Sequence, residues 1–166
     1  YPKKTVVTDD IRSLSYNNLQ FNGNNLAAFL KKYKITKGDR VAFLSYNRIE
    51  FSEILYATSK LGAIVVPINF RLSKEEIVDI VRDASPKFFL YERSFLKTIN
   101  YIIKNNLLTK NRVLCIDAKN YYNLITNSKN INFSNLKNSK KSDEWSLMYT
   151  SGTTGKPKGV IRNHEG

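Results

Sequence analysis

Residues 149–159 carry the side chains of this chain that are best suited to hold an anion. They read YTSGTTGKPKG, with four Ser/Thr hydroxyls, three glycines and two lysines around a proline. Glycine has no Cβ, so the backbone can turn consecutive N–H groups toward an anion and let it approach closely. The hydroxyls add uncharged donors and the lysines add positive charge, which suits the several oxygens of a pyrophosphate or triphosphate. We predict that the phosphate ligands are Thr150, Ser151, Gly152, Thr153, Thr154, Gly155 and Lys158.

Two common phosphate-binding loops do not match this stretch. The Walker pattern G-x-x-x-x-G-K-[ST] fails because Pro157 stands five residues after Gly152, and Pro157 also follows Lys156 where the pattern requires Ser or Thr. The dinucleotide pattern G-x-G-x-x-G fails because glycines 152, 155 and 159 are three and four residues apart. The alternative is a Gly/Ser/Thr surface loop without function. It is disfavoured because the stretch is eleven residues long, ends in Lys-Pro-Lys-Gly and follows a predicted strand.

Other reactive side chains are few. Cys115 lies in the apolar run VLCI and is interpreted as a small buried side chain rather than a nucleophile, and a single cysteine forms no internal disulfide or cysteine metal cluster. His164 is the only histidine, and we expect it to cap a helix or pack rather than to transfer protons. Trp145 and Tyr149 are expected to pack the strand before the loop. We assign no catalytic residue and no metal ligand.

The formal charge of +13 permits a second class of function, a basic nucleic-acid-binding α/β module. The lysines, however, are scattered among asparagines, isoleucines and tyrosines, with no run longer than a pair. We therefore interpret the charge as solvated surface. Lys, Asn or Ser interrupts every apolar run well before the roughly 20 residues of a membrane span, so we expect a soluble, cytoplasmic protein.

Strands and helices alternate along the chain. We expect a hairpin over 5–15, and strands over 40–45, 63–66, 88–91, 113–116 and 145–149. Helices are expected after Ser15, after Asn47 and over 95–104, and the capping box Ser73-Lys74-Glu75-Glu76 should open another. Apolar strands separated by such helices predict an α/β fold, a parallel sheet with helices on both faces.

The chain is expected to form one domain, with α/β layers over 1–118, a surface connection over 119–144 that begins with a short helix, and the strand and phosphate loop over 145–166. The connection is rich in Asn, Ser and Lys, with Leu124 and Ile125 among its apolar anchors. Because the sequence opens on Tyr1 rather than Met and stops where we expect a helix to start, near His164, we expect a piece of a longer protein.

The loop and several other stretches resemble the adenylate-forming superfamily, which includes AMP-forming acyl-CoA synthetases, adenylation domains and luciferases. Residues 150–160, TSGTTGKPKGV, resemble its phosphate-loop signature almost completely. Further similar stretches, in the same order and spacing, are 37–42 (KGDRVA), 61–67 and 69–76 (NFRLSKEE). The run at 69–72 is more similar to the acyl-CoA synthetase branch than to the amino-acid-adenylating branch.

The resemblance implies the N-terminal part of the large domain of an AMP-forming acid–thiol ligase. In this family a carboxylic acid attacks the α-phosphorus of ATP, supported by Mg²⁺, pyrophosphate leaves, and coenzyme A displaces AMP from the acyl-adenylate. The loop residues would hold the β- and γ-phosphates, while the adenine, ribose, magnesium and acyl sites would lie beyond Gly166. Alternatives are an amino-acid or aryl-acid adenylation domain, and a phosphate-binding regulator without turnover.

Overall fold

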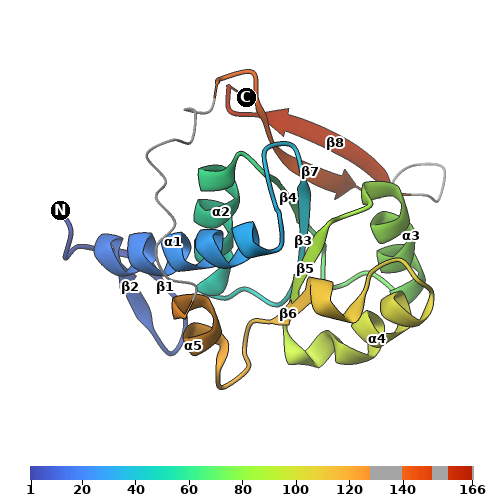
Figure 1. Cartoon of the computed structure of the whole chain (residues 1–166), viewed down its shortest axis with the longest axis horizontal. Coiled ribbons are helices and arrows are strands. Elements are labelled where there is room, and N and C mark those ends of the chain that lie inside the picture. Colours follow the sequence, from blue (N-terminus) through green and yellow to red (C-terminus); the bar gives the residue numbers. More distant parts are fainter. Residues whose placement is uncertain (128–139, 151–156, 166) are drawn as a thin grey trace.

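The computed structural model describes residues 1–127, 140–150 and 157–165, and it contains a mixed six-stranded sheet (Figure 1). The strand order is β6-β5-β3-β4-β7-β8. Its strands are β3 (Arg40–Leu44), β4 (Ile64–Pro67), β5 (Phe88–Tyr91), β6 (Val113–Cys115), β7 (Glu144–Thr150) and β8 (Lys158–Asn163). The first five run parallel and β8 pairs antiparallel with β7, so the predicted parallel sheet is confirmed and gains an antiparallel edge strand.

Helices cover both faces of this sheet, as predicted. The helices are α1 (Tyr16–Lys32), α2 (Glu50–Leu61), α3 (Lys74–Ala84), α4 (Leu96–Lys104) and α5 (Tyr121–Thr126). Short 3₁₀ turns occur at Arg93–Phe95 and Lys110–Arg112, and β1 (Thr5–Thr8) pairs with β2 (Ser13–Ser15) as a separate hairpin. Among the residues described here, no helix is long and apolar enough to cross a membrane.

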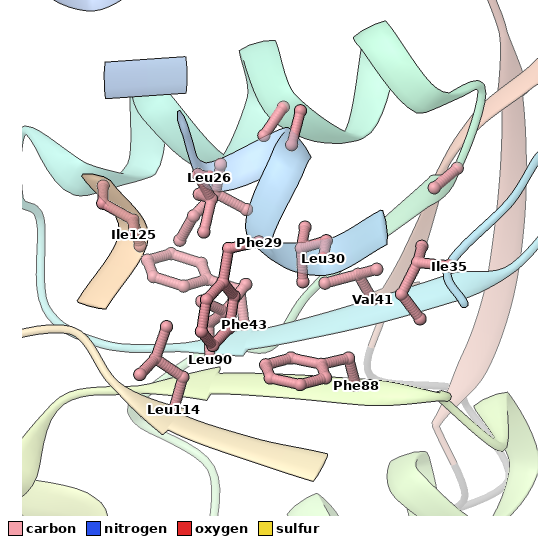
Figure 2. Close-up of a cluster of buried hydrophobic side chains, with 14 of the residues drawn as sticks. Leu26, Phe29, Leu30, Ile35, Val41, Phe43, Phe88, Leu90, Leu114 and Ile125 are labelled. Atoms are coloured by element: carbon pink, nitrogen blue, oxygen red, sulfur yellow. The ribbon is translucent and has the colours of Figure 1, made fainter. Parts of the chain in front are cut away.

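Two apolar cores lie on opposite faces of the sheet because successive strand residues point to opposite sides. On β5, Phe88 and Leu90 join the core beneath α1, α2 and α5, whereas Phe89 and Tyr91 join the core beneath α3 and α4. Figure 2 shows the first core, with Phe29 and Leu30 of α1 above the strands. Burial on both faces explains why the strands read as continuous apolar runs.

The predicted helix signals are mostly confirmed. Ser15 accepts a hydrogen bond from the Asn18 N–H at 3.3 Å, and the capping box of Ser73 and Glu76 is complete. The chain leaves α2 through Gly62, whose φ of 65° is the left-handed conformation that glycine adopts without a Cβ clash. The prediction that Asn47 caps α2 is wrong.

Helix α2 begins two residues later than that prediction placed it, at Glu50. Ile49 stands at the N-cap without a side-chain hydrogen bond, and Glu50 and Glu53 lie in the first turn. Two negative side chains there complement the positive end of the helix dipole. This interaction stabilises the start of the helix in place of a side-chain cap.

The C-terminal third differs from the prediction in two respects. Tyr121 and Ile125 of α5 are fully buried in the core beneath α1, while the expected anchor Leu124 is 40% exposed. Residues 128–139 of the expected connection lie outside the described part. Strand β8 was not predicted; its β-branched residues Val160 and Ile161 favour a strand, and they pair with Met148 and Leu147 of β7.

Candidate functional site

Two of the predicted phosphate ligands, Thr150 and Lys158, lie on the β7–β8 hairpin. Thr150 ends β7 and Lys158 opens β8, and the antiparallel register places them directly opposite each other. Opposed residues of such a pair are about 5 Å apart between Cα atoms. Both side chains are exposed. The structure thus brings these two predicted ligands together where β7 ends and β8 begins, one on each strand.

The remaining predicted ligands are Ser151, Gly152, Thr153, Thr154 and Gly155. They lie within 151–156, outside the described residues, and remain predictions. Their flanking residues are nevertheless paired, so the segment connects two adjacent strand ends.

Gly159 lies close to the side chains of Leu147 and Tyr149 on the neighbouring strand. A Cβ built on it would lie 2.9 Å from Leu147 Cδ1 and 3.2 Å from Tyr149 Cζ. Real Cβ atoms essentially never approach another heavy atom as closely as the first of these distances. The Tyr149 ring therefore occupies the space above Gly159, one pair away from Thr150 and Lys158.

Aromatic side chains hold the hairpin to the rest of the molecule, as predicted for Trp145 and Tyr149. Trp145 packs against the core beneath α1 and α2, and the His164 ring stacks on it at 6.3 Å between centroids. This contact gives His164 the packing role that we expected. The Tyr149 O–H donates to Asp83 Oδ2 of α3 at 2.5 Å, and burial raises the pKa of the phenol, as does the carboxylate.

A pocket of about 360 Å³ adjoins the carboxyl ends of β3, β4 and β7. Its lining includes Ser45, Asn47, Asn69, Phe70 and Met148. Ligands of open α/β sheets bind at the carboxyl ends of strands, where the strand order reverses. Here the chain passes from β3 to β4 on one side and then to β5 on the other side of β3, so the strand order reverses between β3 and β5. The pocket adjoins this point on the β4 side of β3. Sequence reasoning missed this pocket, although polar residues directly after two apolar strands were a usable signal.

A second group of polar side chains is buried where α1, α2 and α5 meet. Glu50 and Glu53 are 1% and 0% exposed. Arg12 Nη2 donates to Glu50 at 2.8 Å, Asn22 Nδ2 donates to Glu53 at 2.7 Å, and the Tyr122 O–H lies 3.3 Å from both carboxylates. Burial, followed by the neighbouring Glu50 charge, raises the pKa of Glu53. These carboxylates bind groups of the fold itself, and we assign them a structural role.

Cys115 does not have the surroundings of a nucleophile. It is half-buried rather than buried as predicted, and its Sγ donates to Asp117 Oδ1 at 3.1 Å. Desolvation, with the Asp117 carboxylate, raises the pKa of the thiol to about 11, so it stays protonated at neutral pH. Within the described ranges no group of three or more His, Cys, Asp or Glu side chains could hold a metal ion.

Several structures of known proteins share this fold. An anthranilate CoA ligase, AuaEII, in complex with anthranoyl-AMP superposes with a TM-score of 0.86 at 27% identity, covering 99% of this chain and 31% of the other. The N-terminal domain of FACL13 from Mycobacterium tuberculosis gives a TM-score of 0.79 at 32% identity, covering 93% of this chain and 38% of the other.

Two curated relatives with similar sequences are CoA ligases. The long-chain-fatty-acid–CoA ligase FadD13 of Mycobacterium tuberculosis is 33% identical over 170 residues, which cover 94% of this chain and 30% of the relative. A 3-oxocholest-4-en-26-oate–CoA ligase of Rhodococcus rhodochrous is 28% identical over 99% of this chain and 31% of its own length. The chain thus spans about a third of the relatives that it matches. The family profile for "AMP-binding enzyme" matches residues 1–166, and the chain belongs to this family.

Proposed function

We propose that this chain is the N-terminal part of an AMP-forming acid–thiol ligase that acts in the cytoplasm. The whole protein would activate a carboxylic acid with ATP and Mg²⁺ to an acyl-adenylate and then transfer the acyl group to coenzyme A. The observation that carries the proposal is the β7–β8 hairpin, which presents Thr150 and Lys158 of a phosphate-loop sequence side by side. Family membership and CoA-ligase relatives support it.

The residues of the hairpin fit the leaving pyrophosphate. When the acid attacks the α-phosphorus, negative charge increases on the β- and γ-phosphate oxygens. Lys158 would hold that charge, while the hydroxyl of Thr150 and the donors of residues 151–155 would orient the oxygens. Fixed donors aimed at developing charge lower a barrier without any protein nucleophile, which agrees with our assigning no catalytic residue.

The acid is defined here only by class. The names of the relatives include long-chain fatty acids and a steroid acid, which support a fatty or other acyl substrate. The structural match to an anthranilate CoA ligase keeps an aryl acid as the alternative substrate. A relative from Streptomyces coeruleorubidus, 29% identical over 98% of this chain and 30% of its own length, is a fatty acid–[acyl-carrier-protein] ligase, which makes a carrier protein the alternative acceptor.

The chain by itself should not turn over substrate. Charged hydrogen bonds contribute about 1.5 to 3 kcal/mol each in favourable cases, whereas association costs about 4 to 15 kcal/mol. One phosphate hairpin therefore binds ATP weakly. If the purified 166-residue chain forms acyl-adenylate and releases pyrophosphate in a mass-spectrometric assay, this part of the proposal is wrong.

The full-length protein provides the main test. It should catalyse exchange of labelled pyrophosphate into ATP that depends on an added carboxylic acid, tested with a panel of fatty and aryl acids. Lys158→Ala should slow that exchange far more than it weakens binding of the acid. Exchange without any acid requirement, or equal losses in both quantities, would contradict the proposed role.

The net charge of +13 offers a separate test of the nucleic-acid alternative. A nucleic-acid binder loses affinity steeply as salt increases and does not need the phosphate hairpin. We expect the full-length protein to show no such salt-dependent binding to DNA or RNA. Tight binding that falls with salt and persists in Lys158→Ala would favour the alternative.

A further inference from the structure

The hairpin that presents Thr150 and Lys158 is held to helix α3 by one side-chain hydrogen bond. The Tyr149 O–H donates to Asp83 Oδ2 at 2.5 Å across 66 residues of sequence. Asp83 lies in the last turn of α3, and Figure 1 shows the end of β7 beside that helix. Tyr149 immediately precedes the first predicted phosphate ligand.

The same ring also fixes the opposite strand. Tyr149 is paired with Gly159, and its ring lies where a Gly159 side chain would be. Tyr149 thus contacts both strands of the hairpin, one residue pair away from Thr150 and Lys158.

Helix α3 meets the hairpin at a further point. Pro157, the residue before β8, lines a pocket of about 500 Å³ together with Asp79, Arg82 and Asp83 of α3. Arg82 and Asp79 form an ion pair with each other at 2.8 Å, whereas the Asp83 carboxylate accepts the hydrogen bond from the tyrosine. Asp83 thus lies near the end of β7 and near Pro157, which precedes Lys158.

We propose that Tyr149 and Asp83 form a positioning pair that fixes Thr150 and Lys158 for the phosphates of ATP. This inference rests on the proposed function. The phenol makes no contact with the reacting atoms in this role. It holds two strand ends in the geometry that the ligand requires, and small misplacements of such groups reduce rates substantially.

Kinetics of pyrophosphate exchange by the full-length protein test the pair. Tyr149→Phe keeps the ring over Gly159 and removes only the O–H, and Asp83→Ala removes the acceptor. Each should lower kcat/KM for ATP about three- to tenfold, as expected for one hydrogen bond, with KM for the acid unchanged. The double variant should resemble either single variant, because both remove the same bond. Asp83→Asn keeps an acceptor oxygen and should restore most of the activity.

Tyr101→Phe on α4 is the matched control and should behave as wild type. Additive losses in the double variant, failure of Asp83→Asn to rescue, or unchanged ATP kinetics in both single variants would overturn the pairing.

Amide hydrogen exchange without nucleotide separates this inference from the proposed function. In Tyr149→Phe the amides of 147–150 and 158–161 should exchange faster than in wild type, while those of β3 and β5 should be unchanged. If wild type lacks acid-dependent pyrophosphate exchange, the proposed function fails, and the amide measurement alone decides whether the bond fixes the hairpin. Unchanged protection in the variant would overturn the inference.

Discussion

The interface of α1, α2 and α5 and the β7–β8 hairpin both concentrate polar side chains, but they use them differently. In the interface, Glu50 and Glu53 are buried and bind arginine, asparagine and tyrosine donors from other elements. In the hairpin, Thr150 and Lys158 are exposed and lie opposite each other where β7 ends and β8 begins. The first group forms its hydrogen bonds within the fold, whereas the second group is available to a ligand.

The difference teaches that a buried charge with a perturbed pKa is insufficient evidence for a site. Glu53 is fully buried and its pKa is raised, yet every contact described for it comes from within the fold. Removing such groups should change stability, whereas removing exposed hairpin groups should change only function. Four predictions test this separation, from the largest expected effect to the smallest.

Lys158→Ala in the full-length protein should slow acid-dependent pyrophosphate exchange about 10²- to 10³-fold, the usual cost of losing one donor to developing charge. Its midpoint of thermal unfolding should stay within about 1 °C of wild type, since surface substitutions are nearly neutral. Lys104→Ala, an exposed lysine on α4, is the control and should change neither quantity. A parallel loss of stability would place Lys158 among the structural groups.

Glu50→Ala should lower the free energy of unfolding of the chain by about 2 to 3 kcal/mol, measured by urea denaturation. Glu50 is 1% exposed and accepts bonds from Arg12 and Arg48 at 2.8 and 3.1 Å. This loss of stability lies at or below the low end of the range for removing one partner of a buried ion pair, because both arginine side chains keep partial solvent contact. In the full-length protein, exchange per folded molecule should be unchanged, and a selective loss of ATP affinity would break the comparison.

Gly23→Ala should destabilise the chain by about 1 to 2 kcal/mol through overpacking between α1 and α2. A Cβ at this position would lie 2.4 Å from Tyr56 Cδ1 and 2.8 Å from Cγ, so the ring must move. Gly23→Ala with Tyr56→Leu should recover part of the loss. Greater stability of Gly23→Ala alone, from the better helix propensity of alanine, would contradict this account of the packing.

Glu53→Gln should produce the smallest effect, a change in how unfolding depends on pH. Burial raises the pKa of Glu53 above its ordinary value of 4.5, so the wild type loses stability as pH rises from about 4.5 through the folded-state pKa. The glutamine variant lacks this loss, so its free energy of unfolding should rise relative to that of wild type over that interval. Urea denaturation between pH 4 and pH 7 measures the difference.

Glu75→Gln is the control of opposite sign. Its own backbone amide, followed by Lys74, lowers the pKa of the exposed Glu75 carboxyl. Glu75 therefore makes wild type more stable as pH rises toward 4.5, the ordinary pKa of this carboxyl. The free energy of unfolding of the variant should fall relative to that of wild type over that interval. Equal trends in the two variants would show that burial does not set the behaviour of Glu53.

Local signals in the sequence predicted much of the fold. Ser15, Ser73 and Gly62 mark helix boundaries through bonds within a few residues, and apolar runs such as 88–91 mark buried strands. The prediction that Asn47 caps α2 was wrong because acidic side chains in the first turn stabilise the start of this helix instead of a cap. Strand β8 was missed because it depends on pairing with β7, and that pairing is not visible in its own six residues.

The candidate site was predicted in part for the same reason. The loop composition identified Thr150 and Lys158 as phosphate ligands, and the register that places them opposite each other follows from tertiary structure. Nothing local indicates that Tyr149 reaches Asp83, since 66 residues separate them. The buried cluster was likewise invisible, because Arg12, Glu50 and Tyr122 meet only when three elements pack.

The most direct test of the central claim is a crystal structure of the full-length protein with a non-hydrolysable ATP analogue. Our account predicts that β- and γ-phosphate oxygens lie within hydrogen-bonding distance of the Lys158 ammonium and the Thr150 hydroxyl. Phosphates bound elsewhere, with the β7–β8 hairpin free of ligand, would contradict it.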